Sequence, residues 1–220
     1  MLAISGMASS NAAITVLTFE GLGDFESVSN YYNGGFGGNG SGPGTNYGVT
    51  FSNSALALID SDAGGSGYIG GEPSPSTGLF FVGDTAIMTY ATGFTTGFSF
   101  YYTAINYPGV VKVYDGLDGT GNLLASIVLP KTISDGGDPT GAFSPFFAIG
   151  VNFNGTARSV DFGGTANQIV FDNITFGSSS PVSSIPEPGN VIPLGCLLVS
   201  GLAFRNRRGL RRRGAQNSKS

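Results

Sequence analysis

The sequence contains no histidine, no tryptophan and only one cysteine, Cys196. Without histidine, a Ser-His-Asp triad, a Cys-His dyad and a histidine-ligated transition metal are all excluded. A single cysteine also excludes a disulfide framework within the chain. The groups that remain for chemistry or binding are carboxylates, amides, hydroxyls and the rings of phenylalanine and tyrosine.

Positive charge is also scarce until the last residues. Only Lys112, Lys131 and Arg158 are basic before position 205, whereas all 14 acidic residues precede it. The other seven of the 10 basic residues are Arg205, Arg207, Arg208, Arg211, Arg212, Arg213 and Lys219. A nucleic-acid-binding domain spreads its basic residues over a folded face. Their concentration in one terminal tail therefore argues against nucleic acid as a partner.

An uncharged run of 14 residues, "VIPLGCLLVSGLAF" at positions 191–204, directly precedes these arginines. A membrane-spanning helix needs about 17–25 largely apolar residues, and arginine side chains at its end extend its reach. Clusters of Lys and Arg mark the cytoplasmic end of such a helix. We therefore expect a single C-terminal transmembrane helix that leaves the arginines in the cytoplasm. The alternative is a buried C-terminal strand followed by a disordered basic tail.

The residues around this run resemble a known sorting signal. Pro186-Glu187-Pro188, the apolar run and the arginine cluster occur in the same order as in the PEP-CTERM signal of exported proteins from Gram-negative bacteria that make extracellular polysaccharide. The resemblance implies an inner-membrane intermediate that an exosortase, a membrane-embedded cysteine protease-transpeptidase, processes near the Pro-Glu-Pro triplet. It further implies that the processed protein reaches the cell surface or the extracellular matrix. The departures from the family pattern are Gly189-Asn190, Pro193 and Cys196.

The N-terminus is expected to carry the matching export signal. Residues 1–8 are mildly apolar, and Ser10-Asn11-Ala12 places small residues at the −3 and −1 positions of a cleavage site before Ala13. A complete signal peptide also has a basic region and a longer apolar core. We interpret residues 1–12 as a partial signal peptide and expect its basic region to lie upstream. The alternative is a cytosolic protein with an irregular N-terminus.

Residues 13–178 are predicted to form an all-β domain. The 37 glycines and the low charged fraction of 11% disfavour helices, and short alternating or β-rich runs recur between turn residues. An antiparallel two-sheet sandwich of jelly-roll type is expected, followed by a flexible spacer at 179–185 and the sorting signal at 186–220. The predicted strands cover residues 14–20, 48–52, 55–59, 79–82, 86–90, 95–103, 110–114, 123–129, 146–152, 158–162 and 168–176. The clearest hairpin spans 110–129, and Phe98, Phe100 and Tyr102 share one face.

Calcium is the cofactor that the oxygen groups of this chain would suit best, because it binds six to eight oxygen ligands. Asp60 and Asp62 are spaced like the first ligands of an EF-hand loop, but Gly64 and the position of Glu72 break that motif. A calcium site of another kind in this loop stays open. The alternative is a solvated turn in which the aspartates bond their own backbone.

The two ends of the domain resemble the first and last strands of carbohydrate-binding-module-like sandwiches. The stretches are "LTFEG" at 17–21 and "IVFDNITFG" at 169–177. The resemblance implies a structural Ca²⁺ held by Glu20 and Asp172. By parity, Asp172 falls on the apolar face of Val170, Ile174 and Phe176, where a carboxylate is costly unless a cation or another partner compensates it. A bulge that turns Asp172 outward is the alternative.

The expected function is binding rather than catalysis, with a structural or adhesive role at the cell surface. The partners expected are extracellular polysaccharide, the membrane and the processing exosortase. A carboxylate-dependent polysaccharide hydrolase is the enzyme alternative, but no motif pairs two of the acidic residues. A self-assembling surface protein without sugar affinity is a third hypothesis. The tyrosines that lie in or beside loops and could stack on sugar rings are Tyr31, Tyr32, Tyr47, Tyr68 and Tyr107.

Overall fold

The computed structural model describes residues 14–83, 85–134 and 141–183. Within these residues no helix is long and apolar enough to cross a membrane. The predicted signal peptide, the Pro-Glu-Pro triplet, the predicted transmembrane helix and the arginine cluster all lie outside the described residues. Export, processing and membrane orientation therefore stay predictions.

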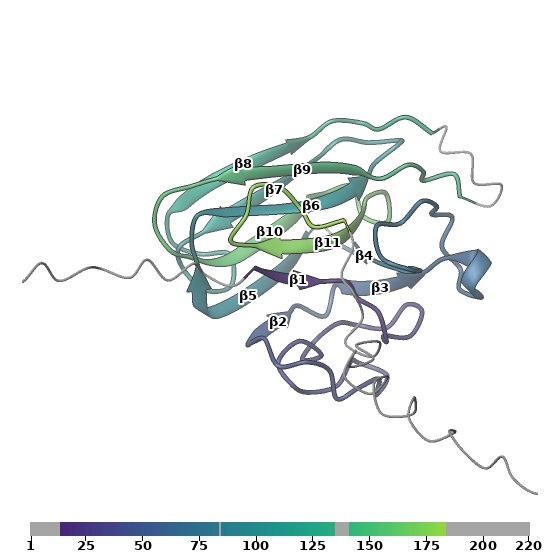
Figure 1. The fold of residues 1–220 in the computed structure, drawn as a ribbon, viewed down its shortest axis with the longest axis horizontal. Helices are drawn as coiled ribbons and strands as arrows, with labels where there is room; N and C mark the ends of the chain where they lie inside the picture. Colours follow the sequence, from purple (N-terminus) through teal and green to yellow (C-terminus); the bar gives the residue numbers. More distant parts are fainter. Residues whose placement is uncertain (1–13, 84, 135–140, 184–220) are drawn as a thin grey trace, which may run out of the picture. The chain divides into compact units, whose positions relative to one another are not determined.

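The described residues form two antiparallel sheets (Figure 1). Sheet I has six strands in the order β3-β4-β11-β6-β9, with β1 also paired to β11, and sheet II has five in the order β2-β5-β10-β7-β8. The strands are β1 (Thr15–Leu17), β2 (Val49–Phe51), β3 (Ala55–Ile59), β4 (Thr77–Phe81), β5 (Thr85–Phe94), β6 (Gly97–Thr103), β7 (Gly109–Tyr114), β8 (Leu123–Leu129), β9 (Phe147–Asn152), β10 (Ala157–Gly164) and β11 (Val170–Phe176). A short 3-10 helix, η1 (Ser61–Ala63), lies between β3 and β4. The prediction of an all-β, two-sheet antiparallel fold is confirmed.

The core between the sheets is built mainly from phenylalanine. The predicted shared face of β6 is confirmed, because Phe98, Phe100 and Tyr102 are all buried in the main cluster. The other phenylalanines of this cluster are Phe19, Phe51, Phe81, Phe94, Phe153, Phe162, Phe171 and Phe176. The predicted 110–129 hairpin is present as β7 and β8. Side chains of period two thus bury one face of each sheet in this core.

A bulge in β11 decides which way Asp172 points. The register with β6 shifts between Asp172 and Thr175, and Asn173 has a left-handed φ of 48°. Phe171 and Ile174 consequently both face the core, whereas Asp172 lies opposite Tyr101 on the outer face of sheet I. The parity prediction that grouped Asp172 with Ile174 is wrong, and the bulge is the reason.

Two strands share one edge of β11. β1 pairs with its C-terminal half, where Leu17 lies opposite Ile174, and β4 pairs near its start, where Leu79 lies opposite Phe171. β1 is shorter than the predicted strand over 14–20 because Phe19 takes a left-handed φ of 64°, which ends the extended backbone. A gap in the ladder results between β1 and β4, beside Asp172.

Residues 178–183 lie against sheet I. The hydroxyl of Ser99 donates to the carbonyl oxygen of Ser178 at 2.9 Å, and Asn173 Nδ2 donates to that of Val182 at 2.7 Å. Gly97 lacks the side chain that would block this approach, since an added Cβ would lie 2.6 Å from the Ser179 nitrogen. The first part of the expected flexible spacer, here called the C-terminal arm, is therefore hydrogen-bonded to the domain.

Candidate functional site

The gap between β1 and β4 contains the buried carboxylate of Asp172, which has no exposed surface. Its Oδ2 accepts the Ser74 backbone N–H at 2.9 Å, and the Ser74 hydroxyl lies 2.8 Å from each carboxylate oxygen. The N–H of Asn173 donates to Oδ1 at 2.6 Å. Burial raises the pKa of Asp172 to about 7, with a contribution from the charge of Glu20, although the hydrogen bonds from Ser74 and Asn173 act to lower it.

Glu20 binds the same segment from the other side. Its Oε1 accepts the backbone N–H of Ser76 at 3.1 Å and of Thr77 at 2.8 Å. The Thr77 hydroxyl lies 3.3 Å from Oε2. The structure therefore brings Glu20 and Asp172, which are far apart in the sequence, to the segment that leads into β4. Both carboxylates fix the start of that strand.

The oxygen atoms gathered in this gap are of the type that Ca²⁺ binds. Besides the carboxylates of Glu20 and Asp172, they include the hydroxyls of Ser74 and Thr77 and the carbonyl oxygen of Thr18, which accepts from Ser74 at 3.2 Å. Among the described residues, no three acidic or cysteine side chains form a group suited to a metal ion. A calcium ion here would therefore take hydroxyl, carbonyl or water oxygens in addition to two carboxylates.

Asp60 and Asp62, the second predicted pair of calcium ligands, differ in burial. Asp60 is only 7% exposed and its backbone nitrogen donates to the Ser76 carbonyl oxygen at 2.9 Å. Asp62 lies in η1 and is exposed. Neither joins a metal-binding group with other acidic residues in the described part of the chain. A calcium ion at this loop stays a prediction.

Glu26 is a structural carboxylate that sequence reasoning did not identify. Its side chain is fully buried and accepts backbone N–H groups from Gly23 at 2.6 Å, Asn39 at 2.8 Å and Ser41 at 3.0 Å. Burial alone would raise its pKa, but the hydrogen bonds from Ser41, Gly23 and Asn39 outweigh burial and lower the pKa to about 2. Glu26 therefore holds the glycine-rich loop of residues 31–48 through Asn39 and Ser41.

The five candidate tyrosines differ widely in exposure. Tyr32 is buried, and its hydroxyl accepts the Phe19 N–H at 2.5 Å. Tyr31 is half-buried and donates to the Glu20 carbonyl oxygen at 3.0 Å. Tyr47, Tyr107 and Tyr68 are 38%, 51% and 67% exposed. Tyr68 is thus the most accessible ring of the set.

Tyr68 lines a pocket of about 260 Å³ on the outer face of sheet I, here called the outer-face pocket. Its floor is apolar, with Leu58 from β3, Phe80 from β4 and Val170 from β11. Phe25, 51% exposed, packs edge-on against Phe80 with ring centroids 5.4 Å apart. The other lining residues are Ser66, Gly67, Ile69, Phe143, Asn167 and Gln168.

Backbone and side-chain contacts fix the polar rim of the outer-face pocket. The N–H of Asn167 donates to the Phe81 carbonyl oxygen at 2.9 Å, and Asn106 Nδ2 donates to Gln168 Oε1 at 2.8 Å. Ser66 bonds Asp24, which also accepts the Ile59 N–H at 2.9 Å. An exposed aromatic ring thus stands beside the amide side chains of Asn167 and Gln168 and an apolar floor, which is the composition of a small-molecule or glycan site.

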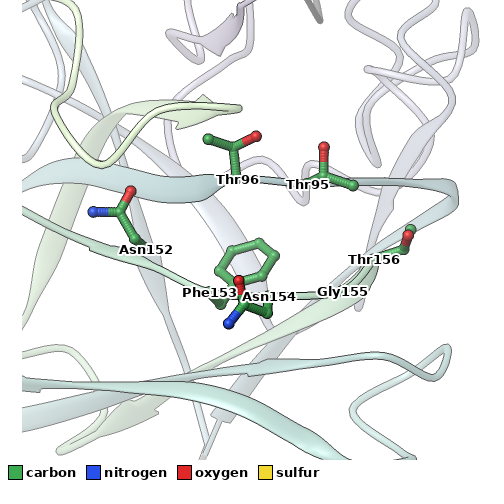
Figure 2. A pocket seen from close by; sticks show the side chains of 7 residues that line it. All are labelled: Thr95, Thr96, Asn152, Phe153, Asn154, Gly155 and Thr156. Atoms are coloured by element: carbon green, nitrogen blue, oxygen red, sulfur yellow. The ribbon is translucent and has the colours of Figure 1, made fainter.

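A second depression lies between two turns of the sandwich (Figure 2). It has a volume of about 620 Å³ and is here called the turn hollow. Its lining residues are Thr95, Thr96, Asn152, Phe153, Asn154, Gly155 and Thr156. Sequence reasoning did not identify it, because its two segments are far apart in the chain and nothing in the sequence shows that they meet.

No family model matches the sequence. No curated protein matches it either. The fold is similar to a family 6 carbohydrate-binding module at 14% identity, a TM-score of 0.36, and coverage of 58% of this chain and 85% of the other. A carbohydrate-binding module of a Cellvibrio mixtus lichenase, in complex with cellotriose, is similar at 12% identity and a TM-score of 0.34, with 56% of this chain and 85% of that chain covered.

A cleaved adhesin domain of Lys-gingipain from Porphyromonas gingivalis is similar at 14% identity and a TM-score of 0.32, with 76% of this chain and 93% of that chain covered. All these likenesses concern the general arrangement of strands. TM-scores this low transfer no ligand and no site residue to this chain.

Proposed function

We propose that this chain is an exported, non-catalytic β-sandwich protein that associates with extracellular polysaccharide through the outer-face pocket. The single observation that carries the binding part is the position of Tyr68, 67% exposed at the edge of an apolar floor. Sugar rings present C–H faces that pack on aromatic rings, and hydroxyl edges that bond amides such as those of Asn167 and Gln168. Tyr68 would provide the stacking ring and the two amides the polar contacts.

Binding is favoured over the hydrolase alternative by the contacts of Glu20 and Asp172, the two carboxylates that the structure brings to the segment before β4. A glycosidase needs an acid and a base or nucleophile on either side of an accessible bond. Asp172 has no exposed surface and Ser74 occupies both of its oxygens. This pair therefore supports the start of β4 and does not face a substrate.

Affinity electrophoresis of the full-length protein in native gels containing the host's extracellular polysaccharide tests the binding proposal. Tyr68→Ala is expected to weaken the apparent affinity about tenfold, because an aromatic contact contributes roughly 0.5–1.5 kcal/mol beyond the area it buries. Phe36→Ala is the matched control, since Phe36 is 54% exposed and lies outside the pocket. Equal retardation of wild type and Tyr68→Ala would contradict the assignment. Release of reducing sugar ends would instead favour the hydrolase.

The second part of the proposal is that the C-terminal tail directs sorting. An apolar helix would halt translocation, the arginines would stay in the cytoplasm, and the prolines would hold the triplet extended. Intact mass and fractionation in the native host test it with Pro186, Glu187 and Pro188 all changed to alanine. Loss of the tail from the wild type alone, with the variant retained in the inner membrane, is expected. Two intact cytoplasmic proteins would contradict export and sorting together.

A further inference from the structure

The turn hollow is formed by two connections that cross between the sheets. One is the tight turn Thr95–Thr96, which joins β5 to β6, and the other is residues 153–156, which join β9 to β10. The two are held together by the Phe153 N–H, which donates to the Thr96 carbonyl oxygen at 3.2 Å. Figure 2 shows the side chains of both connections around the same space.

Thr96 adopts a backbone conformation that its side chain disfavours. Its φ is 80°, and the Gly97 N–H donates to the Thr95 carbonyl oxygen at 3.0 Å, which is the hydrogen bond of a three-residue turn. A turn of this kind with positive φ at its centre is rare and strained. Thr96 is the only β-branched residue with positive φ among the described residues, and such a residue is an outlier where glycine would be free of strain. Local stability therefore does not account for threonine at this position.

The polar groups around the turn hollow are available to a ligand. The side chains of Thr95, Thr96, Asn152, Asn154 and Thr156 are all exposed. Within the described part of the chain, none of these five side chains makes a hydrogen bond to another protein group. Hydroxyl and amide groups both donate and accept hydrogen bonds. They therefore suit a ligand whose groups also donate and accept hydrogen bonds.

The base of the turn hollow is aromatic and uncharged. Phe153 is 9% exposed and packs edge-on against Phe94, with ring centroids 5.7 Å apart. None of the seven lining residues is acidic or basic. Charged ligands would find no counter-charge here, whereas a neutral hydroxyl-rich ring would find both hydrogen-bonding groups and an apolar edge.

We propose that the turn hollow is a second binding site, which takes a neutral saccharide through the hydroxyl of Thr96 and the amides of Asn152 and Asn154. It shares no residue with the outer-face pocket. The inference rests on the proposed function only for the chemical class of the ligand. A chain with both sites is able to contact two polysaccharide strands.

The test is affinity electrophoresis of the full-length protein in native gels that contain dextran or hydroxyethyl cellulose, two neutral polysaccharides, or alginate, an anionic one. Thr96→Gly removes the hydroxyl and relieves the strained turn. Its melting temperature is expected to equal or exceed that of the wild type, while its apparent affinity for the neutral polysaccharide that binds falls about fivefold. Thr96→Ser is the matched control, because it keeps the hydroxyl and should retain the wild-type affinity. Asn154→Ala is expected to weaken binding similarly.

The inference is overturned if neither neutral polysaccharide retards the wild type, if alginate retards it as strongly, or if Thr96→Gly binds as well as the wild type. Tyr68→Ala, measured in the same gels, separates the two proposals. Loss of affinity only in Thr96→Gly supports the turn hollow and contradicts the outer-face pocket, and loss only in Tyr68→Ala does the reverse.

Discussion

Ser74 binds both carboxylate oxygens of Asp172, a residue 98 positions later in the chain, through its backbone N–H at 2.9 Å and its hydroxyl at 2.8 Å. The contact closes the gap that β1 and β4 leave beside β11. One residue, through its backbone and its side chain, thus provides most of the hydrogen bonds to a carboxylate that has no access to water.

We expect Ser74→Ala to lower the free energy of unfolding by about 1–3 kcal/mol, because a buried carboxylate loses a hydrogen-bond donor. Ser76→Ala is the matched control. Its hydroxyl lies 3.5 Å from Glu20, and the backbone bond from Ser76 to Glu20 at 3.1 Å does not need that hydroxyl. The control should stay within about 0.5 kcal/mol of the wild type. Urea denaturation gives both values, and equal losses in the two variants would contradict the role of Ser74.

If calcium binds in the gap, it will raise the melting temperature, because a ligand that binds only the folded state stabilises that state. At a calcium concentration a hundredfold above Kd the stabilisation is about 2.7 kcal/mol. Scanning calorimetry of the full-length protein in Ca²⁺ and in EDTA measures the shift. Glu20→Gln should abolish it and Asp62→Asn should not. Abolition by Asp62→Asn alone would move the ion to the loop of Asp60 and Asp62, and identical curves in Ca²⁺ and EDTA would contradict both sites.

The lowered pKa of Glu26 predicts that the folded state loses stability in acid. Its folded pKa of about 2 lies below the ordinary value of 4.5, so the unfolded chain binds the proton more tightly. The stability that this carboxylate contributes is complete above about pH 4.5 and is lost as the pH falls toward 2. Glu26→Gln is expected to cost about 1.5–3 kcal/mol at pH 7 and to flatten this part of the pH profile. Urea midpoints of both proteins, measured between pH 2 and pH 7, check this. If the midpoint of Glu26→Gln falls with pH as steeply as that of the wild type, the assignment is incorrect.

The C-terminal arm depends on Asn173. Asn173→Gly keeps the left-handed backbone, which glycine adopts freely, and removes the side-chain bond to Val182. We expect faster hydrogen exchange of the Val182 amide and faster proteolysis within residues 178–183, because local opening no longer breaks that bond. Ser180→Gly, in which the change falls on an exposed residue, controls for an added glycine. If hydrogen exchange at Val182 is unchanged in Asn173→Gly, the arm is held by its other contacts and the prediction is contradicted.

Alternating or β-rich runs between turn residues predicted a strand at the place of each of β1–β11, and in β6 the buried face is visible directly in Phe98, Phe100 and Tyr102. The same rule misplaced Asp172, since one extra residue in a bulge inverts the parity and leaves no mark on composition. Glu26 was missed because its partners are backbone N–H groups. The exposure of Tyr68, and the meeting of the two turns at Thr96 and Asn154, depend on tertiary contacts that local patterns do not encode.

The central place of β11 has a kinetic consequence. This last strand joins β1, β4 and β6 in sheet I, so a nascent chain that ends before Val170 leaves the β3–β4 pair and the β6–β9 pair unconnected. The core then lacks Phe171, Ile174 and Phe176. The domain closes only when its final strand is complete, and pairings this distant in sequence form on the millisecond-to-second scale. Synthesis of the domain therefore ends before its folding does. During that interval the chain is still unfolded enough to pass through a narrow pore.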